Sequence, residues 1–408
     1  MTFKRCEGLN MLSISKRAQK LAPSETLAMA AKARELKAKG VDVVSFATGE
    51  PDFDTPSFIK ASAKRALDDG LTKYTPSAGI PELRKAIKAK FKNDNGLDYA
   101  EDEICVTCGA KQAIYNALQV LLGEGDEAIV VAPYWVSYPE QVRLAGAAPV
   151  IVPTTAKNSF KLTPASLEAA ITPRTRAIIL NTPSNPTGSA YTRDELAAIG
   201  EILARRGVAI ISDEIYEKLV YGEFRHVSIA AACPAARDLT ITINGVSKAY
   251  AMTGWRMGYA AGPREVISKM TTLLGQQITG IPGFVQRACV DALTGPQEEI
   301  ERMRKEFAAR RDLMLERLLS IPEIRCHVPE GAFYLLPNVE AYLGRRWNGR
   351  AIADATELAG YLIDEAHIAT VSGDPFGIPG YIRFSYATSR ENIEEGAGRL
   401  KEALLKLS

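Results

Sequence analysis

Short apolar runs rich in isoleucine and valine alternate with helical patterns along this chain, and they constrain its fold more than any other feature. The runs read EICVT at 103–107, EAIVVAP at 127–133, RAIIL at 176–180, GVAIIS at 207–212 and LTITI at 239–243. Apolar residues follow one another in them without alternation, which is typical of strands covered by helices on both faces. Strands that alternate with helices favour a mostly parallel sheet, so the sequence predicts an α/β fold.

Helix signals separate or follow these strands. The segment TRDELAAIGEILARRG at 192–207 begins with Thr192 as an N-cap, and Glu195 completes a capping box. A longer amphipathic run, EEIERMRKEFAARRDLMLERLLS at 298–320, predicts a long helix. Its charges have mixed signs, which indicates a solvated helix rather than a basic surface for nucleic acid.

The charge balance narrows the choice of partners. Lys and Arg total 50 against 48 Asp and Glu, so neither a nucleic acid nor a polybasic membrane contact is expected. No stretch approaches the roughly eighteen apolar residues of a membrane-spanning helix. The basic N-terminus, MTFKRCEGLNMLSISKRAQKLAPS, lacks the apolar segment of a secretory signal. We expect an ordered arm there, with a transit peptide as the alternative.

Six cysteines are scattered through the chain, which fits free thiols in a reducing compartment, and we expect a cytoplasmic location. Cys105 and Cys108 form a C-x-x-C pair, a spacing that can serve redox or metal chemistry. No second Cys or His pair with ligand spacing accompanies it, because the three histidines are far apart. The segment EICVTCGAKQA instead predicts a strand that turns into a helix from about Ala110, and no metal site is expected.

Polar, aromatic and glycine residues gather where the predicted strands end. In chain order they are Gly109, Ala110, Lys111, Trp135, Asn185, Asp213, Tyr216, Ser247, Lys248 and Arg256. In open α/β sheets, ligands bind at the carboxyl ends of strands, and helix N-termini there attract anions. Each residue alone also has an ordinary explanation: Asp213 could cap a helix, Trp135 could pack in the core, and Arg256 could form a surface ion pair. Their joint arrival at strand ends favours a ligand site.

One kind of cofactor uses all of these groups. A lysine forms a Schiff base with an aldehyde, a carboxylate keeps a pyridine nitrogen protonated, and the ring then accepts electrons. A flat ring favours an aromatic neighbour such as Trp135, and a phosphate favours Arg256 together with the N–H groups that begin a helix. The set predicts pyridoxal 5′-phosphate, with Lys248 at its aldehyde and with Asn185 and Tyr216 near its ring oxygen.

Nine ordered stretches resemble the class I aminotransferases of fold type I. They are ATGEPDFDTP, TKYTPSAGIPELRKAI, GAKQAIYN, APYWVSYPE, NTPSNPTG, SDEIYEKLVYG, VSKAYAMTGWRMGY, PEGAFY and IRFSYATS, and the resemblance runs from about Pro23 to the C-terminus. They are most similar to subgroup Iγ, the branch of bacterial aspartate aminotransferases, some of which also act on prephenate. The resemblance implies transamination between aspartate and 2-oxoglutarate by a ping-pong mechanism.

The resemblance also implies roles at the cofactor. Lys248 matches the lysine that forms the Schiff base and moves a proton between the substrate α-carbon and the cofactor. Asp213 matches the partner of the pyridine nitrogen, and Tyr216 and Asn185 match the partners of the ring oxygen. Trp135 matches the residue that stacks on the ring.

The phosphate end follows from the same resemblance. Arg256 and the backbone amides of Ala110 and Lys111 match the phosphate cradle, with Ser247 as a further candidate. Tyr74 resembles a tyrosine that reaches the phosphate from the neighbouring subunit. This implies a homodimer with shared active sites.

Substrate contacts are implied as well. Arg383 matches the arginine that grips the substrate α-carboxylate, a bidentate task suited to a guanidinium. Gly49 lies where the backbone approaches the substrate, beside Trp135 and Asn185.

A second, distal carboxylate needs a further cation. Lys111 is the candidate, assisted by Ser24 and Thr26, although Lys111 could instead line the cavity or pair with an acid. Relatives that accept prephenate often carry a lysine at the position held by Ala22, so prephenate or aromatic donors are alternatives to aspartate.

The resemblance implies a fold-type I architecture with a mostly parallel seven-stranded sheet and a smaller α+β domain. The expected divisions are an N-terminal arm with part of the small domain at 1–56, a large cofactor-binding domain at 57–300 and a small domain at 301–408. The N-terminal segment is expected to pack on the small domain and to lie over the entrance of the active site.

Other classes of protein fit less well. Neither G-x-x-x-x-G-K-[ST] nor G-x-G-x-x-G occurs, which argues against an NTPase or a dehydrogenase. A regulator that only binds the cofactor usually adds a DNA-binding domain, for which we expect no spare length. A lyase or synthase on the same fold stays open, because it would hold the cofactor with the same residues.

Overall fold

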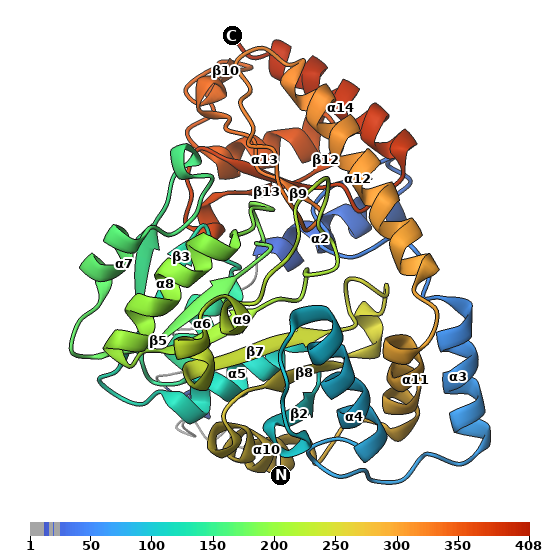
Figure 1. Cartoon of the computed structure of the whole chain (residues 1–408). Coiled ribbons are helices and arrows are strands. Elements are labelled where there is room, and N and C mark those ends of the chain that lie inside the picture. Colours follow the sequence, from blue (N-terminus) through green and yellow to red (C-terminus); the bar gives the residue numbers. More distant parts are fainter. Residues whose placement is uncertain (1–11, 16–18, 20–24) are drawn as a thin grey trace, which may run out of the picture.

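The computed structural model describes residues 12–15, 19 and 25–408, and its layers surround one large sheet (Figure 1). The sheet has seven strands in the order β2-β8-β7-β6-β5-β3-β4. Their bounds are β2 (Ile104–Thr107), β3 (Glu127–Ala132), β4 (Ala148–Pro153), β5 (Thr175–Asn181), β6 (Ala209–Asp213), β7 (Thr240–Gly245) and β8 (Gly258–Ala261). Within this sheet β8 alone runs antiparallel to its neighbours, so the predicted mostly parallel, seven-stranded sheet is confirmed.

The five apolar runs all form strands of this sheet. Two further strands, β4 and β8, were not predicted from the sequence. The edge strand β4 contains Pro149 and Pro153 and leaves Ile151 40% exposed, so its pattern differs from that of a covered strand. The short strand β8 reads GYAA, and its small residues have low strand propensity. Both strands lack the Ile- and Val-rich signal that identified the others.

Helices cover both faces of the sheet, as the apolar runs require. They are α3 (Ser57–Asp68), α4 (Pro81–Lys90), α5 (Ala110–Leu121), α6 (Ser137–Leu144), α7 (Pro164–Ala170), α8 (Arg193–Arg206), α9 (Ile229–Ala232), α10 (Arg264–Ile278) and α11 (Gly283–Thr294). Successive side chains of a strand point to opposite faces. Val130 of β3 accordingly packs in a core with Ile114 of α5, whereas Ile129 packs in another with Leu196 of α8.

Local signals set the helix ends. The Thr192 hydroxyl accepts a hydrogen bond from the N–H of Glu195, and the Glu195 carboxylate accepts one from the N–H of Thr192, which confirms the capping box. Such a cap contributes about 1 kcal/mol to stability.

The strand β2 turns into α5 at Gly109, as predicted for the C-x-x-C segment. Cys105 is buried in β2, and burial raises the pKa of its thiol to about 12, so the thiol is inert.

The C-terminal part packs around a second sheet, of order β13-β14-β9. Its elements are α12 (Glu298–Leu319), β9 (Tyr334–Leu335), β10 (Arg346–Trp347), β11 (Arg350–Ala351), α13 (Ala355–Glu365), β12 (Ile368–Ala369), β13 (Val371–Ser372), β14 (Ile382–Ser385) and α14 (Arg390–Leu405). The long helix predicted at 298–320 is α12. It extends from the side of α11 to pack against α14 (Figure 1).

The first described helix joins this C-terminal part. The strand β1 (Val44–Ser45) pairs in parallel with β12, with Val44 opposite Ile368. The helix α2 (Glu25–Ala38) contacts β12 and β13. Across the part of the chain that the structure describes, no helix has the length and apolar character needed to cross a membrane.

Candidate active site

A cavity of about 360 Å³ opens at the carboxyl ends of β5, β6 and β7. Most of the predicted site residues line it: Thr26, Gly49, Ala110, Lys111, Trp135, Asn185, Asp213, Tyr216, Ser247, Lys248, Arg256 and Arg383. Two predicted residues are not among them. Tyr74 is 91% exposed on this chain and lies elsewhere, and Ser24 is outside the described residues.

Lys248 follows β7, and its Nζ donates a hydrogen bond of 2.7 Å to the carbonyl oxygen of Gly49. Burial lowers the pKa of Lys248 to about 8, and the carboxylates of Glu50 and Asp213 oppose this shift. An amine with such a pKa is partly neutral near neutral pH, and the neutral form is the nucleophile. Lys248 is therefore suited to attack an aldehyde.

Asp213 is the last residue of β6, and its carboxylate faces the cavity from a buried position. Its Oδ2 accepts a hydrogen bond of 2.7 Å from the Tyr138 hydroxyl, and its Oδ1 accepts one of 3.2 Å from the N–H of Ile215. Burial raises the pKa of Asp213 to about 6, while these two donors hold the pKa down. The carboxylate is thus oriented by neutral donors, and its negative charge is available to a cation in the cavity.

Arg383 reaches the cavity from β14 and is only 2% exposed. Its Nη1 donates to Oδ1 of Asn185 at 3.0 Å, and its Nη2 donates to the carbonyl oxygen of Ala47 at 2.6 Å. The Nε is buried without a hydrogen-bond partner among the described residues. A buried guanidinium with an unused N–H favours binding of an anion, because an unsatisfied buried donor is costly.

Two tyrosine hydroxyls meet on the same side of the cavity. The hydroxyl of Tyr216 lies 2.9 Å from that of Tyr334, and the guanidinium of Arg383 lies 4.6 Å from the centre of the Tyr334 ring. A Cβ atom at Gly49 would lie 2.2 Å from the Tyr334 hydroxyl. Glycine is therefore required at position 49 for the backbone to approach this group.

The other end of the cavity is shaped for an anion. The helix α5 begins at Ala110, so its free N–H groups and the positive end of its dipole lie there. Arg256 adopts a left-handed backbone conformation (φ 53°), and its Nη1 donates to the carbonyl oxygen of Thr253 at 2.9 Å. A Cβ atom at Gly109 would lie 2.5 Å from Nη2 of Arg256, and one at Gly258 would lie 2.3 Å from the nitrogen of Ala110. These glycines allow the arginine and the helix start to converge.

Lys111 and Trp135 stand together at the cavity wall. The Nζ of Lys111 lies 4.6 Å from the centre of the Trp135 ring. Burial lowers the pKa of Lys111, and the charge of Arg256 lowers it further. Among the described residues, the ammonium has a cation–π contact and no carboxylate partner, which leaves it available to a negatively charged ligand.

Sequence reasoning did not single out eight of the residues that line the cavity, among them Tyr138, Asn181 and Tyr334. Tyr138 and Tyr334 lie within APYWVSYPE and PEGAFY, but their hydrogen bonds run to distant segments. Asn181 ends β5, donates to the carbonyl oxygen of Asp213 at 2.9 Å and accepts from the N–H of Asn185 at 2.8 Å. Its place at a strand end was the signal that could have identified it.

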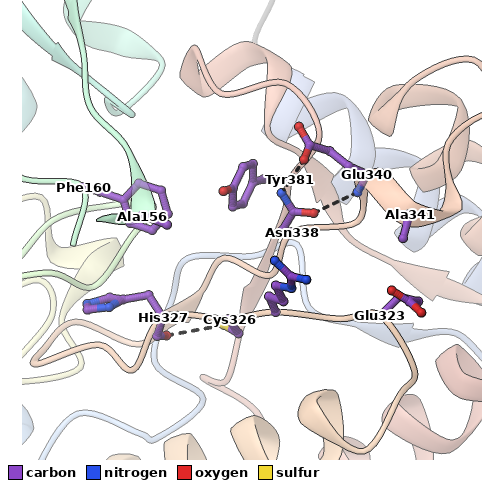
Figure 2. A pocket seen from close by; sticks show the side chains of 10 residues that line it. Ala156, Phe160, Glu323, Cys326, His327, Asn338, Glu340, Ala341 and Tyr381 are labelled. Atoms are coloured by element: carbon purple, nitrogen blue, oxygen red, sulfur yellow. Dashed lines mark hydrogen bonds between the residues drawn. The ribbon is translucent and has the colours of Figure 1, made fainter. Parts of the chain in front are cut away.

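A second cavity, of about 550 Å³, lies where residues 323–341 face Ala156 and Phe160 (Figure 2). The Cys326 thiol contacts the carbonyl oxygen of His327 there, and burial raises its pKa to about 12. None of the predicted site residues that the structure describes lines this cavity. The convergent lysine, carboxylate and arginine groups are in the first cavity, which is the candidate active site.

Comparisons with known proteins agree with this geometry. Residues 41–400 match the family model described as aminotransferase class I and II. An aspartate aminotransferase from Geobacillus stearothermophilus is 49% identical over 392 residues, which cover 95% of this chain and 98% of the relative. An aspartate/prephenate aminotransferase from Cereibacter sphaeroides is 48% identical over 400 residues, covering 98% of this chain and all of the relative.

Solved structures of aspartate aminotransferases have the same overall fold as this chain. The aspartate aminotransferase from Rhizobium meliloti superposes with a TM-score of 0.93 at 43% identity, covering 98% of this chain and 100% of the other. The Thermus thermophilus aspartate aminotransferase with maleate gives a TM-score of 0.90, also at 43% identity, covering 96% of this chain and 100% of the other. The chain therefore belongs to the class I and II aminotransferases, pyridoxal 5′-phosphate-dependent enzymes that transfer an amino group between an amino acid and a 2-oxo acid.

Proposed function

We propose that the protein is an aspartate aminotransferase that transfers the amino group of aspartate to 2-oxoglutarate. The observation that carries the proposal is the meeting of Lys248, Asp213 and Arg383 in one cavity, with a second cation, Lys111, at its wall. The names of the relatives from Geobacillus stearothermophilus and Cereibacter sphaeroides support the choice of aspartate. The reaction follows a ping-pong order, in which the donor leaves as a 2-oxo acid before the acceptor binds.

The donor set of the cavity fits pyridoxal 5′-phosphate. Arg256 and the first N–H groups of α5 hold the phosphate, in a cradle that side chains at Gly109 and Gly258 would fill. Ser247 lines the same cavity and adds a hydroxyl. Asp213 would hold the protonated ring nitrogen, and Trp135 would lie against the ring, since both line the cavity.

The ring oxygen has partners in Asn185 and Tyr216. The Tyr216 hydroxyl is already ordered by Tyr334, and the Asn185 side chain by Arg383, so both are oriented before the cofactor binds. When bound, pyridoxal 5′-phosphate supplies an aldehyde that takes up the amino group and a ring that takes up the electron pair released at the substrate α-carbon.

Lys248 transfers the proton of the substrate α-carbon. Its Nζ, with a pKa of about 8, accepts a proton from the substrate α-carbon and returns it at the next step. The hydrogen bond to the carbonyl oxygen of Gly49 keeps Nζ directed into the cavity. Burial thus keeps a fraction of the amine neutral near neutral pH, and the neutral amine is the form that accepts the proton.

Arg383 and Lys111 each bind one of the two carboxylates of the substrate. The free Nε and the remaining N–H groups of Arg383 bind the α-carboxylate, and Gly49 lets the backbone approach it. Lys111, with the partly buried Thr26 of α2, faces the distal carboxylate. Ser24 and Ala22 lie outside the described residues, so the prephenate alternative rests on the relatives' names alone.

The enzyme acts as a homodimer whose active sites are shared. Tyr74 is 91% exposed on one chain, and an apolar surface that includes Leu67 and Ile278 extends beside Arg256. Exposed apolar area of this kind favours a protein partner, and a second copy would bring its Tyr74 to the phosphate.

We assign three parts to the chain: an arm with part of the small domain at 1–56, a large cofactor-binding domain at 57–300 and a small domain at 301–408. The contacts of α2 and β1 with β12 support the first division, and the continuous helix α12 supports the last. The five described cysteines are free thiols, which supports a cytoplasmic location.

A panel of amino donors and 2-oxo acids tests the proposal. The purified protein is given aspartate, glutamate or phenylalanine with 2-oxoglutarate, oxaloacetate or prephenate, and each 2-oxo acid product is measured. We expect aspartate with 2-oxoglutarate to give the highest kcat/KM. Repeated turnover of aspartate without an acceptor, with release of ammonia or carbon dioxide, would indicate a lyase, whereas the ping-pong order allows at most one equivalent of oxaloacetate per site. A preference for phenylalanine would indicate an aromatic aminotransferase.

A further inference from the structure

Two acids on the turn after β6 lie on the side away from the active-site cavity. Asp213 and Tyr216 line the cavity, whereas Glu214 and Glu217 are buried behind it, at 0% and 7% exposure. A buried carboxylate is costly unless donors surround it, and well-packed apolar residues would often serve stability equally well. The burial of these two acids therefore needs an explanation other than packing.

Glu214 has three side-chain partners. Its Oε1 accepts hydrogen bonds from the hydroxyls of Ser212, at 2.7 Å, and Ser228, at 2.8 Å. Its Oε2 lies 2.9 Å from Nε2 of His226. Ser212 belongs to β6, and Ser228 directly precedes α9. Glu214 thus ties the end of the strand to a segment that follows more than a dozen residues later.

Glu217 is bound separately. Its carboxylate forms an ion pair with the buried Lys90, and its Oε2 accepts from Nδ2 of Asn95 at 2.9 Å. Burial alone would raise the pKa of Glu217, but Lys90 and His226 lower it to about 2. Glu214, Glu217 and His226 are close enough to one another to hold a metal ion. The ammonium of Lys90 and the donors to Glu214 already fill these positions, so the cluster is an internal hydrogen-bond network.

The contacts continue from Glu214 to the cavity. Glu214 fixes the start of the turn, and the next residue, Ile215, donates its N–H to Oδ1 of Asp213 at 3.2 Å. We propose that Glu214 is a positioning residue for Asp213, which it orients through the turn and through this N–H. The inference rests on the proposed role of Asp213 at the ring nitrogen of pyridoxal 5′-phosphate. Burial is the main cause of the raised pKa of Asp213, and the negative charge of Glu214 raises it further.

The test compares cofactor binding by three variants of the full-length protein. Glu214→Ala removes the anchor, and Glu214→Gln keeps an oxygen for the two serines. Glu127→Ala is the matched control: Glu127 is also buried and accepts bonds from Thr172 and Arg174, but it begins β3 at the far end of the sheet. The dissociation constant of pyridoxal 5′-phosphate is measured by titrating each apoprotein, and the Tm is measured with and without the cofactor.

We expect Glu214→Ala to raise the dissociation constant about tenfold, the size typical of residues that orient a ligand-binding group. Its cofactor-induced rise in Tm should shrink, and Glu214→Gln should recover most of both losses. Glu127→Ala should lower the Tm of the apoprotein but leave the dissociation constant within about twofold of the wild type.

Equal dissociation constants for Glu214→Ala and Glu127→Ala would overturn the inference. If Glu214→Ala does not fold, Ser228→Ala decides instead, because it removes one donor; we expect a rise of about threefold, and an unchanged constant would overturn the inference. A wild-type protein that binds no pyridoxal 5′-phosphate would contradict the proposed function itself, which distinguishes the two failures.

Discussion

The hydroxyl of Tyr138 donates a hydrogen bond of 2.7 Å to Oδ2 of Asp213, and this contact joins α6 to the end of β6. The tyrosine is buried, and its pKa is raised well above the usual value, first by burial and then by the charge of Asp213. It therefore remains a hydrogen-bond donor at any physiological pH. The carboxylate that we assign to the ring nitrogen is held in one orientation by a neutral partner.

Replacing Asp213 by Asn should slow transamination by several orders of magnitude, because the amide cannot keep the ring nitrogen protonated. Each tenfold loss corresponds to about 1.4 kcal/mol of activation free energy. The measurement is kcat/KM for aspartate at saturating pyridoxal 5′-phosphate. A loss smaller than about threefold would mean that Asp213 only caps the turn.

The same substitution should change the pH dependence of stability in the apoprotein. The pKa of Asp213 is raised from 3.8 to about 6, so the folded state holds this proton more tightly than the unfolded state. The contribution of Asp213 to the free energy of unfolding therefore falls as pH rises through that interval and is constant above it. Urea unfolding at pH of about 4 and about 7 should show Asp213→Asn gaining stability relative to wild type at the higher pH. A difference that does not vary with pH would contradict the shift.

Lys248→Ala should abolish turnover, because it removes the buried amine that lines the cavity 2.7 Å from the carbonyl oxygen of Gly49. The visible absorbance of the lysine-bound cofactor should disappear as well. The protein should still fold and bind free cofactor through Arg256 and the start of α5, which circular dichroism and a Tm shift would report. Retention of wild-type activity would exclude Lys248 as the nucleophile.

Lys111→Ser should separate substrates by their second carboxylate. The backbone N–H at position 111 stays available to the phosphate, and only the ammonium over Trp135 is removed. Aspartate and glutamate should lose catalytic efficiency equivalent to about 1.5–3 kcal/mol, the range of a charge-assisted hydrogen bond. Phenylalanine, which lacks a distal carboxylate, should change far less. Equal losses for aspartate and phenylalanine would show that Lys111 only lines the cavity.

Mixing two impaired variants should test the proposed sharing of active sites between two subunits. Tyr74→Phe and Lys248→Ala each damage both sites of a homodimer, but a mixed dimer contains one site with an intact Lys248 and an intact Tyr74. Statistical exchange of subunits should then restore about a quarter of wild-type activity. The control is a mixture of Lys248→Ala with Arg383→Ala, since those residues belong to the same site of the same chain. No recovery in the first mixture would place Tyr74 outside the partner's site.

The sequence alone determined the class of fold and most members of the cavity. Ile- and Val-rich runs identified the covered strands because burial on both faces excludes polar residues, and the residues after each run were candidates because parallel strands end at one edge. β4 and β8 escaped because an edge strand is partly exposed and because GYAA is too short and small to stand out. The apolar runs and the residues that follow them are local features of the sequence, so they can be recognised without the three-dimensional structure.

Only the tertiary structure decided how the candidates meet. The bonds from Tyr138 to Asp213, from Arg383 to Asn185 and between the hydroxyls of Tyr216 and Tyr334 join residues that are 75, 198 and 118 positions apart. No pattern of composition or periodicity encodes such contacts, because they depend on which segments the sheet and its helices bring together. Burial in the completed fold also lowers the pKa of Lys248 to about 8 and raises that of Asp213 to about 6, because desolvation depends on the segments that pack around each residue.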